Sequence, residues 1–305
     1  MSEKNNHTAI AGSLLLVVIL WGANNAGTKW LVASWPPIWT GETRFLFAGL
    51  ILLAVLRYTP WLGKFQPLTP GVRRELWWRG GLSLASYIVL FCWALRLTTA
   101  AHVALYIGAS PIWALLVEGR PEKNWSSARR YGAALLAVSG VAVLFWPALK
   151  TSGFNLRGEI CGLLCSVLWA NYNHQSRVLA RRLSGLEVAA NAMWMSGVWL
   201  LPFALLDVAI HGLRLDAAHV NVQGLCVLFG GVVPYALWNS ALRHWQTSRV
   251  MLFNNFIPLT TATAAHYLPG EPLTPTFCVA MILIVAGVAI GQVEWEKIFK
   301  EPEGF

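Results

Sequence analysis

Charged side chains are scarce in this sequence. Only 12% of its 305 residues are Asp, Glu, Lys or Arg, whereas 56% are hydrophobic, and the mean hydropathy is +0.52. Soluble domains carry roughly 25% charged residues, so this composition cannot cover a surface that faces water. A surface that faces lipid needs few charges, and several apolar stretches reach the length of about 20 residues that crosses a bilayer core. The composition therefore predicts an integral membrane protein.

Several functional patterns are missing as well. The first apolar run starts near Thr8, is too long for the hydrophobic core of a signal peptide and has no small-residue cleavage site, so we expect it to stay in the mature protein. The five cysteines lie in apolar stretches without grouped His or carboxylate residues, which favours packing over metal binding. We expect no disulfide framework, no metal site and no cofactor.

Three other classes of protein fit less well. An intramembrane enzyme needs grouped catalytic residues, and the apolar stretches hold no HExxH or HxxxH pattern, phosphate-binding loop or carboxylate pair. A channel needs a ring of charged side chains or an oligomeric pore. The net charge of +9 comes from short loops between apolar stretches, a distribution that sets membrane topology and does not indicate nucleic-acid binding.

The apolar stretches predict an all-α membrane protein with ten transmembrane helices. The first five helices are expected at 9–30, 36–57, 75–96, 99–118 and 129–147. The second five are expected at 157–177, 185–206, 221–241, 248–268 and 273–292. Only short connections remain, so we expect no soluble domain, and 293–305 is expected to form a cytoplasmic tail.

The basic residues predict how the helices are oriented. Of the 23 Lys and Arg residues, Arg44 lies inside a predicted helix. With a cytoplasmic N-terminus, five lie on the outer side: Lys29, Arg96, Lys150, Arg157 and Arg214. The remaining seventeen lie on the cytoplasmic side. Because cytoplasmic loops carry the excess of Lys and Arg, we expect both termini to be cytoplasmic.

The two halves of the chain share features at a nearly constant offset of 147 or 148 residues. The pairs are Leu20-Trp21 with Leu168-Trp169, Ala94-Leu95-Arg96 with Ala241-Leu242-Arg243, Pro111 with Pro258, and Gly140-Val141-Ala142 with Gly287-Val288-Ala289. Such self-similarity indicates an internal repeat, with halves at 1–148 and 149–292. Five helices per half is an odd number, so the second half enters the membrane upside down. Inverted repeats are typical of alternating-access carriers, whose substrate site lies near the midplane between the halves.

Several motifs resemble one known family. Trp21-Gly22-Ala23-Asn24-Asn25 with Lys29, Arg44-Phe45-Leu46-Phe47-Ala48-Gly49, and Gly270-Glu271-Pro272-Leu273-Thr274 resemble EamA-type members of the drug/metabolite transporter superfamily. The resemblance covers about residues 9–292. It implies a carrier of the bacterial inner membrane that exports amino acids, related metabolites or drugs. The small multidrug members use a carboxylate in the first helix, and this chain has no Asp or Glu between Thr8 and Trp30, so that mechanism does not carry over.

Polar and aromatic residues inside predicted helices are candidates for the substrate cavity, because polar groups are costly in a membrane. In the first and sixth helices, at matching positions, they are Trp21, Asn24, Asn25, Trp169, Tyr172 and Asn173. In the fourth helix they are His102, Tyr106 and Ser110, which share one face. In the seventh to ninth helices they are Asn191, Trp194, Tyr235, Trp238, Asn239, Asn254 and Asn255. Tyr87 is a weaker candidate. The alternative for each is a bond that merely bridges two helices.

Charged residues and prolines add further candidates. Glu42 and Arg44 lie two apart in the second helix, on nearly opposite faces, so they cannot neutralise each other. A structural ion pair of Glu42 with Lys29 is the first interpretation, and proton coupling or substrate recognition through Glu42 is the second. His102 is a second candidate for a pH-sensitive step. Pro111 and Pro258 are candidate hinges. Glu118, Glu159 and Glu187 lie at helix ends and are interpreted as solvated or capping.

The sequence thus predicts an alternating-access transporter, and not an enzyme. Its expected substrates are amino acids or related zwitterionic and aromatic compounds, moved outward across the inner membrane. Uptake of a neutral metabolite, such as a sugar or nucleobase, is the alternative. We expect the partners to be the small-molecule substrate, the lipid bilayer and, as a candidate coupling ion, the proton. Nucleic acid is not expected, and the chain is expected to be a monomer or a homodimer.

Overall fold

A computed structural model of the chain describes residues 3–59, 67–110, 155–245, 247–267 and 274–292, together with single residues between 113 and 143. All regular secondary structure in these ranges is helical, as expected. The helices of the first half are α1 Glu3–Val32, α2 Pro37–Tyr58, α3 Pro70–Glu75, the π-helical η1 Leu76–Leu82, α4 Ser83–Leu97 and α5 Ala100–Gly108.

The second half begins with α8 Leu156–Leu179 and α9 Gly185–His211. Its third helix consists of α10 Ala217–Leu225, the π-helical η2 Cys226–Val232 and α11 Val233–His244. The helices that follow are α12 Thr247–Met251, the 3-10 helix η3 Leu252–Phe256, α13 Ile257–Tyr267 and α14 Pro275–Gln292.

The described helices overlap the predicted ranges, and several of them extend a few residues beyond the predicted ends. Five are long and apolar enough to cross a membrane: Thr8–Val32, Pro37–Tyr58, Pro70–Leu97, Gly185–His211 and Ala217–His244. The chain is therefore a multi-pass membrane protein. The described residues leave out most of the fifth predicted helix at 129–147 and most of the end of the fourth. They also leave out Pro111, Glu118, Gly270 to Leu273 and the tail at 293–305.

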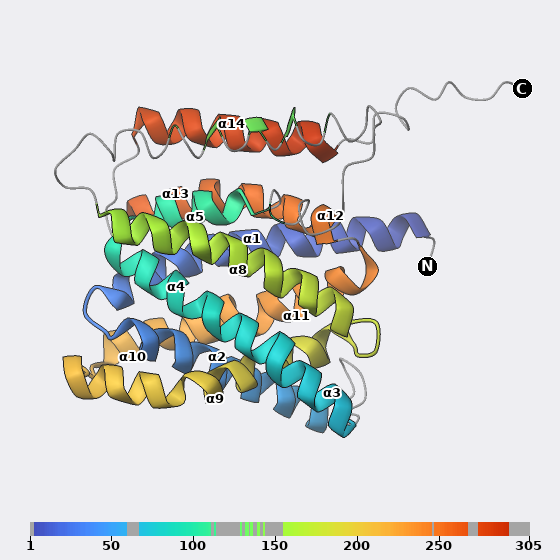
Figure 1. Cartoon of the computed structure of the whole chain (residues 1–305), viewed down its shortest axis with the longest axis vertical. Coiled ribbons are helices and arrows are strands. Elements are labelled where there is room, and N and C mark those ends of the chain that lie inside the picture. The colour runs from blue at the N-terminus through green and yellow to red at the C-terminus, as the bar shows by residue number, and fades with distance from the viewer. Residues whose placement is uncertain are drawn as a thin grey trace, which may run out of the picture.

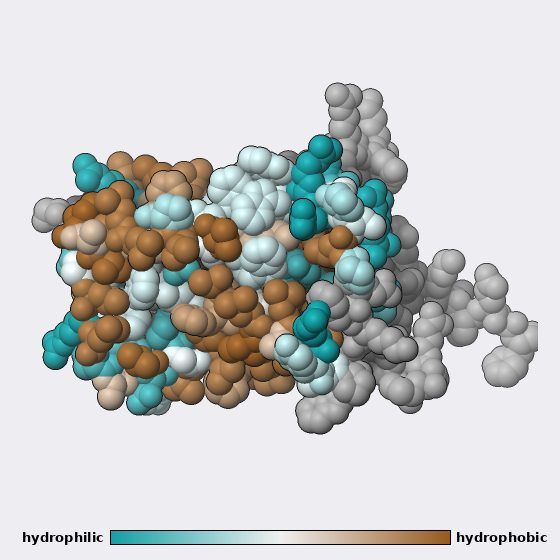
Figure 2. Space-filling model, turned by 90° about the horizontal axis from the view of Figure 1, so that it is seen from below, coloured by the Kyte–Doolittle hydropathy of each residue, from teal (hydrophilic) through white to brown (hydrophobic). Residues whose placement is uncertain are grey.

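The described helices run side by side along one direction (Figure 1). α14 lies at one edge of the bundle, α2, α9 and α10 lie at the opposite edge, and α1, α8 and α11 lie between them. Hydrophobic side chains cover much of the face seen from below (Figure 2). The exposed hydrophobic side chains of α9 include Phe203, Leu206 and Ile210, which are 57%, 58% and 66% exposed. A helix face of this kind is suited to contact with lipid.

The third helix of each half contains a π-helical segment that ends in a Gly-Gly pair. Gly80 and Gly81 lie in η1, and Gly230 and Gly231 lie in η2. After η2, Pro234 has no N–H to donate to Gly230 O four residues earlier. That carbonyl instead accepts a hydrogen bond of 3.2 Å from Trp21 Nε1. The irregular turn therefore connects α1 to η2.

The packing between the halves is reciprocal. α2 packs along α9, η1 packs against α9, and η2 packs against α2. Likewise α4 packs against α8 while α11 packs against α1, and α5 packs against α8 while α13 packs against α1. These contacts join helices from both halves of the sequence. This arrangement leaves a shared interior in which side chains from both halves meet.

Candidate functional site

A small cavity lies where the two halves meet. It is lined by Trp21, Asn24, Asn25, Arg44, Tyr87, Phe91, Ile107, Trp169, Gly230, Tyr235 and Ile257. The space open to the centre of a water molecule is ≈ 20 Å³, which suffices for about one water. The cavity in this conformation is therefore too small for an organic metabolite.

Aromatic rings close around the cavity. The ring centroids of Trp21 and Trp169 are 5.3 Å apart at an interplanar angle of 84°, an edge-to-face contact. Trp21 also lies 4.9 Å from Trp238 and 5.6 Å from Tyr235, and Tyr87 lies 4.9 Å from Trp169. The structure thus brings together the predicted pair of tryptophans from the first and sixth helices. Their role in substrate binding stays a prediction.

The cavity also contains polar groups. Asn25 Nδ2 donates to Thr261 Oγ1 at 3.0 Å, which joins α1 to α13. Trp169 is only 1% exposed, and its Nε1 has no hydrogen-bond partner among the described residues. A buried N–H without an acceptor is uncommon in proteins. The cavity therefore offers an unused donor beside its aromatic walls.

Arg44 supplies the positive charge of the cavity. It is 3% exposed, and its Nη1 donates to Asn24 Oδ1 at 3.1 Å and to Thr28 Oγ1 at 3.0 Å. Its Cζ lies 5.1 Å and 5.3 Å from the ring centroids of Phe45 and Phe91. Its Nε has no partner among the described residues. Neutral acceptors and ring faces therefore hold this guanidinium, and no ion pair recorded for the described residues includes it.

Glu42 does not line this cavity. One helical turn away on either side, Ile38 N donates to Asp207 Oδ2 of α9, and Leu46 lies against Gly197 of α9. Glu42 therefore belongs to the face of α2 that packs on α9, opposite Arg44, as its spacing predicted. Among the described residues, Glu42 and Lys29 do not form the predicted ion pair. Lys29 Nζ instead donates to the carbonyl oxygens of Leu95 at 2.8 Å and Thr98 at 2.6 Å.

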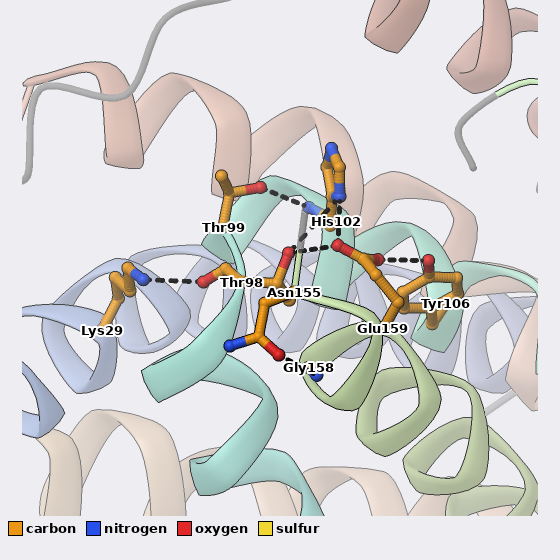
Figure 3. A network of polar contacts seen from close by, with 8 residues as sticks. All are labelled: Lys29, Thr98, Thr99, His102, Tyr106, Asn155, Gly158 and Glu159. Atoms are coloured by element: carbon orange, nitrogen blue, oxygen red, sulfur yellow. Dashed lines mark hydrogen bonds and ion pairs between the residues drawn. The ribbon is translucent and has the colours of Figure 1, made fainter. Parts of the chain in front are cut away.

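A second polar cluster joins α5 to α8 (Figure 3). The Glu159 carboxylate accepts from Thr98 Oγ1 at 2.5 Å, lies 3.0 Å from His102 Nδ1 and accepts from Tyr106 Oη. Its side chain is 3% exposed, whereas that of His102 is 24% exposed. The interpretation of Glu159 as solvated or capping is wrong, because these three donors surround a buried carboxylate. Glu187, by contrast, forms a capping box with Ser184, as expected.

Several predicted cavity residues form a layer behind the aromatic rings. Asn173 Nδ2 donates to Trp169 O at 2.7 Å, and Asn173 Oδ1 accepts from Trp238 Nε1 at 2.5 Å. Asn239 Nδ2 donates to Tyr235 O at 2.9 Å and contacts the Tyr172 hydroxyl at 3.3 Å. These residues hold the ring-bearing helices together and do not themselves line the cavity.

The other candidates lie further from the cavity. Asn254 Nδ2 donates to Ser110 Oγ at 3.2 Å between η3 and α5, and Asn255 is buried beside it. Pro258 follows the 3-10 turn of η3, so the ninth helix is irregular where a hinge was predicted, although hinge motion stays a prediction. Asn191 Oδ1 accepts from Trp194 Nε1 within α9.

Some lining groups carried no clear signal in the sequence. Phe91, Ile107 and Ile257 are ordinary apolar residues of predicted helices, and Gly230 contributes through its backbone. The contacts of Glu159 had a signal in the sequence. His102 and Tyr106 form a polar stripe on one helix face, and such a stripe needs an acceptor on a neighbouring helix. A carboxylate near the start of the sixth helix could have been proposed as that acceptor.

A larger apolar groove adjoins the central cavity. It lies between α1 and the α10–η2 helix and has a volume of ≈ 550 Å³. Its walls are formed mainly by Leu20, Ala23, Gly27, Trp30, Val222, Leu225, Cys226 and Phe229. The groove shares Asn24 and Gly230 with the central cavity. These two residues therefore separate an apolar groove from the site of Arg44.

Comparison with known proteins agrees with this arrangement. The model of the EamA-like transporter family matches residues 9–146 and again residues 156–290. The chain is 22% identical to a probable amino-acid metabolite efflux pump of Escherichia coli K12, over 98% of this chain and 99% of that protein. It is 24% identical to a probable terminal-alkyne amino-acid exporter of Streptantibioticus cattleyicolor, over 69% of this chain and 70% of that protein.

A solved crystal structure has the same fold. It aligns with a TM-score of 0.67 at 17% identity, over 96% of this chain and 99% of the other. The repeated family match covers most of the sequence and includes the helices that line the cavity. The chain belongs to the EamA-like transporter family.

Proposed function

We propose that this protein is an alternating-access carrier that exports amino acids or related zwitterionic and aromatic metabolites across the inner membrane. The observation that carries the proposal is the closed cavity, to which both halves contribute aromatic side chains and the first half also contributes two amide side chains. Carriers of this kind hold their substrate between repeats and open to one side at a time. The names of the two relatives as amino-acid exporters support the substrate class.

The proposal includes ten helices arranged as two inverted halves, 1–148 and 149–292. The family model matches twice, once in each half. The π-helical segments with Gly-Gly pairs occupy the same place in each half, and the packing between the halves is reciprocal. These features support a pseudo-twofold axis through the cavity, about which the halves rock.

Alternating access further requires the cavity to widen. Its present volume fits about one water, whereas an amino acid needs the rings of Trp21, Trp169 and Tyr235 to separate. The structure is thus interpreted as a contracted state, and the open states follow from movement of one half against the other.

Transport in proteoliposomes tests this function. Proteoliposomes that contain the purified protein and are loaded with unlabelled phenylalanine should accumulate labelled phenylalanine by counterflow. Trp169→Ala and Asn25→Ala should reduce that accumulation, because both residues line the cavity. Trp78→Ala is the matched control, since Trp78 is 53% exposed and lies away from the cavity. Normal counterflow in both cavity variants would place the substrate elsewhere, and uptake of sugars or nucleobases instead would favour the alternative.

Labelling of introduced cysteines tests the orientation. In a variant without native cysteines, Ser184→Cys marks the turn between α8 and α9, and Asp216→Cys marks the turn before α10. In whole cells a thiol reagent that cannot cross membranes should label the Asp216→Cys variant and not the Ser184→Cys variant. The predicted cytoplasmic termini require the same reagent to miss both ends of the chain. Labelling of both turns from outside would contradict the topology.

A further inference from the structure

Arg44 is a buried cation whose charge no described carboxylate balances. Glu159 is held by His102, Thr98 and Tyr106, and Glu42 lies on the opposite face of α2. The remaining described carboxylates that form contacts serve other partners at helix ends: Glu75, Glu187, Asp207 and Asp216. A guanidinium buried in a membrane protein is costly unless an anion or a set of acceptors satisfies it.

The acceptors around Arg44 satisfy only some of the N–H donors of its guanidinium group. Asn24 and Thr28 both accept from Nη1, which leaves Nε without a partner. An arginine binds a carboxylate best through two parallel N–H groups, and Nε belongs to one such edge. Since Arg44 lines the central cavity, that unused edge is within reach of a ligand that enters there.

A second unused donor belongs to Trp169, which lines the same cavity. Trp169 Nε1 is buried and has no acceptor among the described residues. The polar atoms that the cavity leaves unsatisfied at Arg44 and Trp169 are thus both donors, one of them charged. Such a pair is complementary to an oxyanion and not to an ammonium group. Rings of Trp21, Tyr87, Phe91 and Tyr235 form the surrounding wall.

We infer that Arg44 binds the carboxylate of the transported molecule, so that the carrier selects small organic acids with apolar or aromatic side chains. This inference rests on the proposed function, because it takes the central cavity as the substrate site. No Asp or Glu lines that cavity, so the amino group of an amino acid meets amide oxygens and ring faces only. The carboxylate is therefore required, and the free amino group is not.

Four related compounds separate these contributions: phenylalanine, N-acetylphenylalanine, phenylalanine methyl ester and phenethylamine. Binding is measured by thermal shift and flux by counterflow in proteoliposomes. The wild-type protein should bind and move the two acids and should bind the ester and the amine at least about tenfold more weakly, since each lacks the charge-assisted bond. Equal binding of the acid, the ester and the amine would overturn the inference.

Substitutions of Arg44 give the second arm. Arg44→Gln should weaken both acids by at least about tenfold and leave the weak binding of the amine unchanged. Arg44→Lys should fall between, because lysine keeps the charge without the two-pronged edge. Arg182→Gln is the control: it also removes one positive charge, and its side chain is 63% exposed. If Arg44→Gln does not fold, the comparison of the acid with the ester in the wild-type protein still tests whether the carboxylate is required for binding.

The outcomes separate this inference from the function on which it rests. Acids that bind through Arg44 but produce no counterflow contradict transport and sustain the carboxylate site. Counterflow of the amine and ester at the rate of the acid sustains transport and overturns the carboxylate site. No binding of either acid overturns both.

Discussion

The Glu159 carboxylate lies 3.0 Å from His102 Nδ1, across the boundary between the two halves of the protein. Glu159 belongs to α8 and His102 to α5. The contact is therefore one that any relative motion of the halves must keep, shift or break. Thr98 and Tyr106 donate to the same carboxylate, so its loss would affect three donors at once.

Glu159→Ala should destabilise the protein strongly. The substitution leaves the donors of Thr98, His102 and Tyr106 without their acceptor, and breaking a buried pair in this way costs about 3–5 kcal/mol. Glu75→Ala is the control, because its ion pair with Arg182 is exposed and is expected to contribute under about 1 kcal/mol. Thermal unfolding in detergent measures both. Equal melting temperatures would show that the cluster does not stabilise the bundle.

The same cluster is expected to make transport depend on pH. His102 is partly exposed and Glu159 is buried, so a change in the charge of this pair alters the electrostatics at the interface of the halves. The titratable groups nearby are Tyr106, on the carboxylate, and Lys29, on Thr98 O. Glu159→Gln should therefore abolish any effect of a pH gradient on counterflow. If that effect persists and Glu42→Gln removes it, the coupling site lies on α2 instead.

Gly230→Ala should impair the protein through Asn24. A Cβ at this position would lie 1.9 Å from Asn24 Oδ1, so Asn24 must rotate and give up its hydrogen bond with Arg44. We expect a lower melting temperature and weaker substrate binding. Gly224→Ala, earlier in the same membrane crossing, meets no atom within 4 Å and should be neutral or stabilising by up to about 1 kcal/mol. Identical behaviour of the two variants would contradict this role of the glycine.

Asp216 should make the N-terminal end of α10 sensitive to acid. Hydrogen bonds from the His219 side chain and backbone N–H, with Arg214 nearby, lower the pKa of the Asp216 carboxyl below its ordinary value of 3.8. A lowered pKa means that the stabilisation is present above that value and is lost as the pH falls through the folded-state pKa. Asp216→Asn should therefore lower the melting temperature at pH 7 and reduce the difference between pH 7 and pH 3. If Asp216→Asn has the same difference in melting temperature between pH 7 and pH 3 as the wild-type protein, Asp216 does not cause the acid sensitivity.

Helix positions and the meeting of Trp21 with Trp169 could be predicted from the sequence, because both follow from long apolar runs and an internal repeat. The opposite faces of Glu42 and Arg44 followed from helical spacing alone. The contacts of Glu159 do not follow from spacing within one helix, since His102 and Tyr106 lie on α5 and Thr98 lies in the turn before it. The bond from Trp21 to Gly230 O also depends on a π-helical turn, whose position reflects Pro234 and tertiary packing together.

The substrate interpretation changed for a physical reason. The sequence assigned Lys29 to a structural ion pair with Glu42 and left Arg44 without a partner. The structure places Lys29 on the carbonyl oxygens of Leu95 and Thr98, whereas Arg44 faces the cavity with an unused N–H group. Which side of α2 faced the interior could not be decided without the neighbouring helices.

The rings that close the central cavity have a consequence for the cell. A membrane that stores energy as an ion gradient loses that energy through any continuous file of water. Trp21, Trp169 and Tyr235 leave space for about one water, and an aromatic constriction without a continuous file of water insulates against ions. An idle molecule would therefore not discharge the membrane, even when many copies are present.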